Sequence, residues 1–186
     1  NYMARQTGRW SKQYVASQTD DIKSMDRLMA WLAENVPDDE TTSIVHGDFR
    51  LENMIVHPTK PRVIAVLDWE LSTLGHPLAD LAYNCMNYHV PSDGSSKFGF
   101  LGIDLEKMGI PAEDAFVASY CRRTGRENIP DWTFYIAFSL FRIAAIVQGV
   151  YKRGLDGNAS ASDAQTYGEM VKGLADVAWA LIKKGD

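Results

Sequence analysis

Four polar residues crowd into one short stretch of the chain, VHGDFRLENMIV at residues 45–56, between apolar pairs on either side. They are His46, Asp48, Arg50 and Asn53. Burying such side chains costs free energy unless they are paired or put to use. The stretch is therefore the first place to look for a functional site.

The spacing of three polar residues suits phosphoryl transfer. Asn53 follows Asp48 by five residues, and Asp68 follows it by twenty, at the end of the apolar run RVIAVLDW. In that chemistry one carboxylate accepts the proton of the attacking hydroxyl, while an amide oxygen and a second carboxylate hold Mg²⁺. The order matches an H-x-D-x-x-x-x-N catalytic loop followed by a metal-binding Asp in the style of D-F-G.

The composition fits one globular domain spanning residues 1–186. A net charge of −5 provides no basic surface for nucleic acid or an anionic membrane, so neither is expected as a partner. Two cysteines are too few for a disulfide framework and indicate a reducing compartment. We therefore expect an intracellular protein, with the cytoplasm favoured and an organelle left open.

One apolar run, residues 134–151, is the candidate for a membrane span. Arg142 near its centre would cost about 3 kcal/mol in a bilayer. A buried core helix explains the run better. No signal peptide is visible, and the chain begins with Asn, so we expect it to start partway through a longer protein.

Periodicity predicts a mostly helical α+β fold with a small β insertion that carries the polar stretch. Pro111 is expected in the first turn of the helix predicted at 111–124. Thr19 or Asp20 is expected to cap the start of the helix predicted at 20–35. A Gly- and Ser-rich segment at 90–110 is predicted to be a mobile loop. The predicted helices cover 7–18, 20–35, 77–89, 111–124, 131–153 and 161–183, and the predicted strands cover 43–46, 53–57 and 62–69.

These motifs carry a resemblance to a known family. The segment HGDFRLEN…VIAVLDWELSTLGHPLADLAYN resembles the aminoglycoside phosphotransferase and choline kinase family, relatives of protein kinases. It is most similar to the kinase-like domains associated with acyl-CoA dehydrogenase family members ten and eleven. The flanking segments RQTGRWSKQY and SLFRIAAIVQGVYKR are also similar to that subgroup, so the resemblance covers nearly the whole chain. It implies the C-terminal lobe of a protein-kinase-like fold.

The resemblance assigns roles by position. Asp48 corresponds to the catalytic base, and Asn53 and Asp68 correspond to the Mg²⁺ ligands beside ATP. Arg50 takes the place of a phosphate-contacting Lys, although a structural salt bridge explains it equally well. Glu70 replaces the Gly of D-F-G and is a candidate ligand for a second Mg²⁺ or a partner for a basic group.

Three further residues are expected to support the loop or to differ from the family. The resemblance makes His46 and Asp80 architectural, with Asp80 hydrogen-bonding the catalytic loop from the following helix. His76 stands where relatives often have Asp, which puts any ligand role at that position in doubt.

A complete kinase also needs a Gly-rich phosphate loop and a strand Lys, and this chain has neither before residue 43. Either a larger protein contributes an N-terminal nucleotide lobe, or the protein is a non-catalytic, pseudokinase-like binding module. We favour the first interpretation because the chemistry residues are intact. The isolated chain is then expected to be inactive without that lobe.

The acceptor is expected to be a small molecule with a hydroxyl group. Protein kinases place a long activation segment after the metal-binding Asp, whereas here Pro77 opens a helix nine residues after it. An aminoglycoside or amino-alcohol kinase is the alternative, but it would need an acidic acceptor pocket. The weak candidates for contacting the acceptor, which are equally explained as ordinary helix residues, are Tyr83, Asn84, Asn87 and Tyr88.

Similarity to domains associated with acyl-CoA dehydrogenases suggests a hydroxyacyl acceptor, and fusion or association with such a dehydrogenase. An acyl chain needs an apolar slot, closed by the 90–110 loop to exclude water. The same side chains would serve equally well to anchor the loop. The candidates for this slot are Trp69, Leu71, Tyr83, Tyr88, Phe98 and Phe100.

Overall fold

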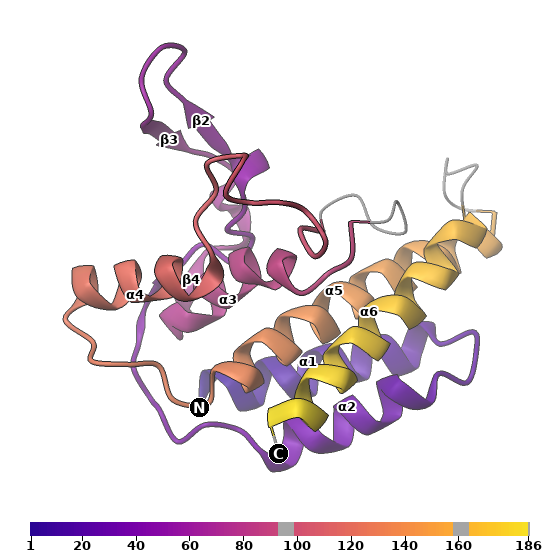
Figure 1. The fold of residues 1–186 in the computed structure, drawn as a ribbon. Coiled ribbons are helices and arrows are strands. Elements are labelled where there is room, and N and C mark those ends of the chain that lie inside the picture. Colours follow the sequence, from indigo (N-terminus) through magenta and orange to yellow (C-terminus); the bar gives the residue numbers. More distant parts are fainter. Residues whose placement is uncertain (93–98, 158–163, 186) are drawn as a thin grey trace.

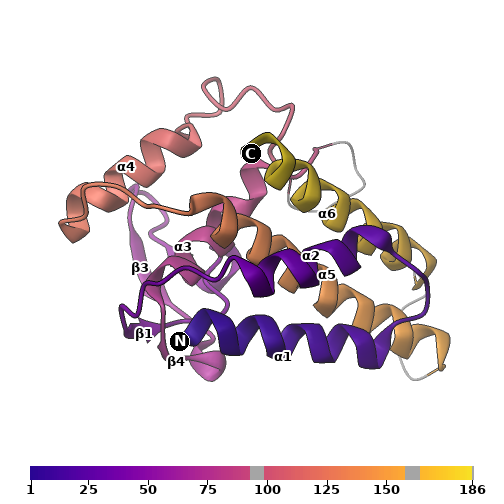
Figure 2. The same cartoon turned by 90° about the horizontal axis from the view of Figure 1, so that it is seen from below.

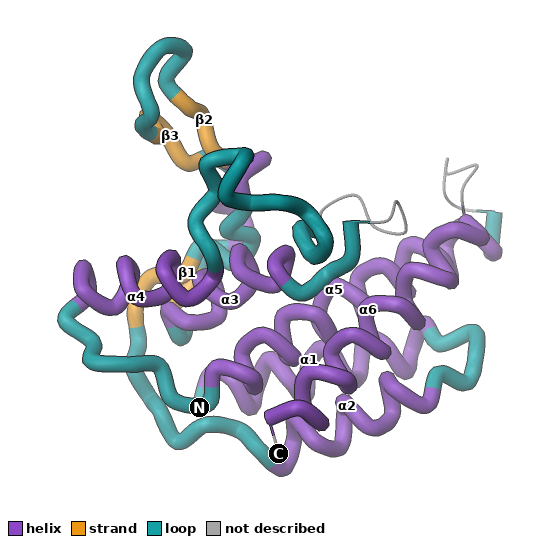
Figure 3. Tube along the Cα trace, in the orientation of Figure 1, coloured by secondary structure: helices purple, strands orange, loops and turns teal. Residues whose placement is uncertain are grey.

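The structure is a computed structural model that describes residues 1–92, 99–157 and 164–185. Helices dominate it, with two small sheets to one side (Figures 1 and 3). The helices are α1 Tyr2–Ser17, α2 Lys23–Glu34, α3 Pro77–Cys85, α4 Glu113–Thr124, α5 Trp132–Leu155 and α6 Ala164–Gly185. The strands are β1 Ser43–Val45, β2 Met54–Val56, β3 Val63–Val66 and β4 Thr73–Gly75. Short 3₁₀ turns are η1 Leu51–Asn53, η2 Trp69–Leu71 and η3 Met86–Tyr88.

The core lies where α5 packs against α1, α3 and α6 (Figures 1 and 2). The residues of α5 are apolar on almost all sides of the helix, which is the pattern of a helix with neighbours on every side. By length and composition alone α5 is also long and apolar enough to cross a membrane. Most of that apolar stretch is buried within the protein, as expected for a core helix.

The two sheets bring the polar stretch together. β1 pairs antiparallel with β4. The segment between these two strands contains Asp48, the strands β2 and β3, and Asp68, and the pairing brings its two ends side by side. β2 and β3 form an antiparallel hairpin that projects from the helical body (Figures 1 and 3). Both ends of the segment at 46–72 are thereby anchored beside α3, which β1 also contacts.

The predicted helices and the three predicted strands are present, with ends that move by a few residues, and residues 57–62 join β2 to β3 as expected. β4 was missed, because a three-residue strand has no periodic signal and exists only through its pairing with β1. The capping prediction for α2 was wrong. Its N-cap is Ile22, without a side-chain cap, because the Thr19 hydroxyl bonds instead to the carboxylate of Asp20 and accepts from Gln148.

The prediction for Pro111 was also wrong. α4 begins at Glu113, and the Pro111 carbonyl lies outside the helix, where it accepts a hydrogen bond of 2.9 Å from the Tyr88 hydroxyl. The described ends of the predicted 90–110 loop are held by the backbone. Phe100 N donates to Asn87 O at 2.8 Å, and Leu101 N donates to Val90 O at 2.9 Å. Phe98 falls outside the described residues.

Candidate active site

Asp80 pins the loop that contains Asp48. One carboxylate oxygen of Asp80 accepts from the His46 backbone N–H at 2.6 Å, and the other accepts from Gly47 N–H at 2.9 Å. Asp80 lies in the first turn of α3, whose start at Pro77 is set by the end of β4. The family resemblance led us to expect that Asp80 bonds to this loop from α3.

His46 connects the loop to the strand that leads to Asp68. Its ring is 3% exposed, with Nε2 2.7 Å from the Leu67 carbonyl and Nδ1 3.2 Å from the Asp48 N–H. One tautomer, with the proton on Nε2, satisfies both contacts. The buried ring therefore holds the backbone of Asp48 and the residue before Asp68 at a fixed separation.

Asn53 bonds directly to Asp48. The amide Nδ2 donates to the Asp48 backbone carbonyl and to its carboxylate oxygen Oδ2, each at 2.9 Å. The backbone carbonyl of Asn53 also accepts a hydrogen bond from the Leu67 backbone N–H at 2.8 Å. These bonds orient the Asp48 carboxylate and leave the amide oxygen of Asn53 for another partner.

Asp68 begins η2 with φ of +63°, a left-handed conformation that Asp tolerates better than most residues. Within the described residues, neither Asp68 nor Glu70 has a hydrogen bond or ion pair through its carboxylate. The carboxylate of Asp68 and the amide oxygen of Asn53 are hard oxygen ligands of the kind Mg²⁺ takes beside substrate phosphates. The described residues contain no cluster of three His, Cys, Asp or Glu side chains that would hold a metal alone. The donor set therefore fits a metal shared with phosphates.

Arg50 forms an ion pair with the proposed base. Its Nε lies 3.3 Å from Asp48 Oδ2, and its side chain is 46% exposed, compared with 18% for Asp48. An ion pair whose arginine side chain is exposed to solvent adds little stability. Arg50 is therefore free to exchange Asp48 for a more strongly charged group such as a phosphate.

The structure separates the four candidates for contacting the acceptor. Tyr83 is buried beneath the loop, and burial together with the facing Asp48 carboxylate raises its pKa to about 12. The Tyr88 hydroxyl donates to the Pro111 carbonyl, and the centre of the Tyr88 ring lies 5.6 Å from that of Phe100 in an edge-on contact. Asn84 and Asn87 are half-buried. Only Tyr83 of the four is placed against Asp48 by the described contacts; acceptor binding by the others stays a prediction.

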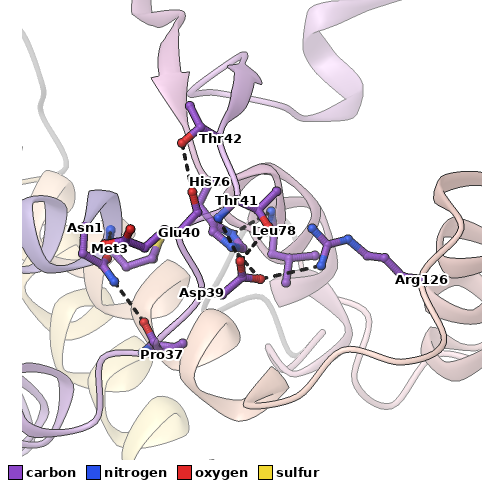
Figure 4. A network of polar contacts seen from close by, with 10 residues as sticks. All are labelled: Asn1, Met3, Pro37, Asp39, Glu40, Thr41, Thr42, His76, Leu78 and Arg126. Carbon is purple, nitrogen blue, oxygen red and sulfur yellow. Dashed lines mark hydrogen bonds and ion pairs between the residues drawn. The ribbon is translucent and has the colours of Figure 1, made fainter.

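His76 caps α3. Its buried Nδ1 accepts from Leu78 N–H at 3.3 Å, and Nε2 lies 3.1 Å from the Asp39 carboxylate (Figure 4). Arg126 approaches the same carboxylate at 3.7 Å, so the segment before β1, α3 and the turn after α4 meet here. His therefore performs the capping task that an Asp would perform. Its role is to place the start of α3, and with it Asp80.

This arrangement predicts an acid-sensitive fold. Burial lowers the pKa of His76 below its ordinary value of 6.5, with Arg126 acting in the same direction against Asp39. The unfolded chain then binds more protons than the folded chain just below pH 6.5, so stability falls as the pH drops below that value. Asp39, whose pKa hydrogen bonds from Thr41 lower to about 2, contributes only in a more acidic window.

The measurement is urea unfolding of this chain between pH 7 and pH 5. We expect His76→Asn, which supplies a capping oxygen in place of the His76 Nδ1, to flatten the loss of unfolding free energy with acid. His57→Asn, on the β2–β3 turn, is the matched control and should retain the slope. An unchanged slope in His76→Asn would contradict the assignment.

Arg142 was missed as a site residue, since in the sequence it served only as an argument against a membrane span. It is 9% exposed, and its Nη2 donates to the carbonyl of Gly47, the residue before Asp48. An Arg in an otherwise apolar core helix is the signal that could have identified it. Only the fold shows which loop it reaches.

A cavity of about 490 Å³ lies on the Phe49 side of the same loop. Its walls are mainly apolar and come from β1, α3 and α4, with Ile44, Leu81 and Phe116 among them. Arg123 supplies a cation to the wall. The cavity therefore borders the residue that directly follows Asp48.

Comparison with known proteins decides the family. The model of the phosphotransferase enzyme family matches residues 1–135. The chain belongs to this family. The loop from His46 to Asn53 lies within the matched residues.

Relatives and a solved structure agree with this family assignment. The chain is 48% identical to mouse acyl-CoA dehydrogenase family member 10 over 184 residues, 99% of this chain and 17% of that protein. It is 44% identical to human acyl-CoA dehydrogenase family member 11 over 185 residues, 98% of this chain and 24% of that protein. A crystal structure from Ralstonia eutropha, of a protein predicted to be an aminoglycoside phosphotransferase, matches with a TM-score of 0.92 and 49% identity over 99% of this chain.

The chain spans 56% of that crystallised phosphotransferase family member and less than a quarter of the two dehydrogenase family proteins. The predicted resemblance and fold class are therefore confirmed: this is a kinase-like phosphotransferase fold.

Proposed function

We propose that the protein containing this chain transfers the γ-phosphoryl group of ATP, with Mg²⁺, to the hydroxyl of a small molecule. The observation that carries the proposal is the bond between the Asn53 amide and the Asp48 carboxylate, in a loop whose backbone is fixed by Asp80 and His46. Such preorganisation suits a base that must meet an acceptor hydroxyl beside a metal-bound phosphate.

Each residue then has one task. Asp48 accepts the proton of the acceptor hydroxyl as it attacks the phosphorus. Arg50 leaves its exposed pair with Asp48 and contacts the transferring group. Asn53 and Asp68, with Glu70 beside a second ion, would hold Mg²⁺, which neutralises charge on the ATP phosphates when bound.

The nucleotide site is proposed to be completed by an N-terminal lobe of the same protein. The β2–β3 hairpin exposes Ile55 by 42%, Val63 by 48% and Ile64 by 50%. Neighbouring apolar side chains of this kind mark a surface that another element covers. The chain alone is therefore expected to turn over little or no ATP.

A hydroxyacyl compound is the proposed acceptor. The apolar cavity beside Phe49 and the half-exposed side chains of Trp69 and Leu71 favour an apolar body. Arg123 in the cavity wall suits an acidic group on the same molecule. An aminoglycoside would instead require acidic walls. Among the described residues, the one carboxylate lining this cavity is that of Asp80, which is already bonded to the loop. The dehydrogenase relatives fit a fused or associated dehydrogenase acting on the product.

A substrate panel with the longer protein tests the proposal. Hydroxyacyl compounds are compared with choline, homoserine, sugars and aminoglycosides by ATP consumption and detection of a phosphorylated product. Phosphorylation of a cationic acceptor alone would end the acyl proposal and preserve the kinase proposal. Absence of product from every acceptor, with nucleotide still bound, would favour a non-catalytic binding module.

The metal assignment makes its own prediction. Asp68→Asn removes one anionic oxygen from the proposed Mg²⁺ site and should lower kcat at moderate Mg²⁺ by at least about a hundredfold, with partial recovery at high Mg²⁺. Mg²⁺ titration of the longer protein measures it. Glu52→Gln, an exposed acidic residue in η1, is the control. An unchanged Mg²⁺ dependence in Asp68→Asn would contradict the assignment.

A further inference from the structure

We infer that Arg142 is a positioning residue for phosphoryl transfer: it holds the Gly47 carbonyl and so sets the direction in which Asp48 is presented. The inference rests on the proposed role of Asp48 as the base. Arg142 is 95 residues away from Gly47 in the chain and comes from the middle of α5, so the contact joins the long core helix to the catalytic loop.

The surroundings of Arg142 do not explain it as a stabilising residue. Its guanidinium lies between two rings, 5.4 Å from the centre of Trp10 and 4.9 Å from that of Tyr83. Among the described residues it has no ion pair with a carboxylate, and its buried Nε has no hydrogen-bond partner. A buried charge with so few partners is costly, and an apolar residue of similar size would commonly stabilise a core at least as well. What an apolar residue cannot do is donate to Gly47.

That donation completes the fixation of one peptide group. In the peptide joining Gly47 to Asp48, the carbonyl accepts from Arg142 and the N–H donates to His46 Nδ1 at 3.2 Å. The preceding N–H groups are already held by Asp80. Rotating the peptide before the base would break bonds at both of its ends. The direction of the Asp48 side chain is therefore set by the backbone as well as by Asn53.

Tyr83 connects the same guanidinium to the base from below. Its ring packs on Arg142, while its hydroxyl faces the Asp48 carboxylate. α5 and α3 thereby support the same residue by two routes, one through the loop backbone and one through the Tyr83 hydroxyl. Loss of Arg142 removes the first route and loosens the second.

Three variants of the longer protein test this inference. Arg142→Met keeps an apolar body of similar length without a donor, and Arg142→Lys keeps the charge and a donor but not the planar stacking. Arg153→Met, at the exposed C-terminal end of α5, is the matched control. For each variant, kcat is expressed per nucleotide-binding molecule, which is counted by titration with a non-hydrolysable ATP analogue.

We expect Arg142→Met to lower this kcat by about a hundredfold with the KM for ATP unchanged, since small misplacements of a reacting group have effects of that size. Arg142→Lys should recover about tenfold of the loss, and Arg153→Met should match the wild type. A merely structural role would reduce the number of binding molecules and leave kcat per binding molecule unchanged. That result would overturn the inference.

Hydrogen exchange tests the loop contact without any turnover. In Arg142→Met, peptides covering 45–50 should exchange faster than in the wild type, whereas those of α6 should not change. Equal exchange at 45–50 would overturn the contact. If the wild type phosphorylates no acceptor, the proposed function fails, and exchange still decides whether Arg142 holds the loop.

Discussion

Asp48→Asn in the longer protein is expected to lower kcat by about 10²- to 10⁴-fold while the fold and nucleotide binding persist. The loss has this size because a positioned general base contributes about that factor. In the wild type the Asn53 amide donates to Asp48 Oδ2 at 2.9 Å. The substituted Asn keeps a side-chain oxygen that can accept the same hydrogen bond. The proton acceptor is removed with little disturbance of the loop.

The measurement is steady-state phosphoryl transfer to an acceptor identified by the substrate panel, beside thermal unfolding of each variant. Glu52→Gln, four residues further along and exposed, removes a carboxylate from the same loop region without touching Asp48. It should leave kcat within about twofold, as surface substitutions usually do. Turnover like that of the wild type in Asp48→Asn would refute the base assignment.

Gly47→Ala should produce the second large effect, this time on stability. Gly47 has φ of +84°, and an added Cβ would lie 2.6 Å from the Leu71 carbonyl oxygen. The left-handed conformation costs a non-Gly residue about 1–2 kcal/mol. The overlap with a backbone atom adds about 1–3 kcal/mol, since His46 and Asp80 prevent the loop from moving away. The expected loss of unfolding free energy is therefore about 2–5 kcal/mol.

Gly102→Ala is a matched control within the chain. Gly102 has φ of +96°, but an added Cβ would meet nothing within 4 Å. It should lose only the conformational part, about 1–2 kcal/mol. Urea unfolding followed by circular dichroism compares the two. If Gly47→Ala is no more destabilised than Gly102→Ala, the close approach of Leu71 to the loop is wrong.

The sequence by itself indicated the family and most of the elements. The order and spacing of Asp48, Asn53 and Asp68 predicted a kinase-type loop, and the family match agrees with it. Helices such as α2 were predictable because apolar periodicity is a local property of the chain. Asp80 as the support of the loop came from the resemblance, and the hydrogen bonds place it there.

Only the tertiary structure decided which distant groups support the site. β4 exists because β1 pairs with it, Arg142 matters because α5 passes beneath Gly47, and His76 meets Asp39 because three segments converge at the start of α3. No short sequence motif identifies these contacts, since each joins segments that the chain separates by about 30 residues or more. Local pattern specifies what each segment forms, whereas the burial of α5 among its neighbours decides which side chains meet the loop.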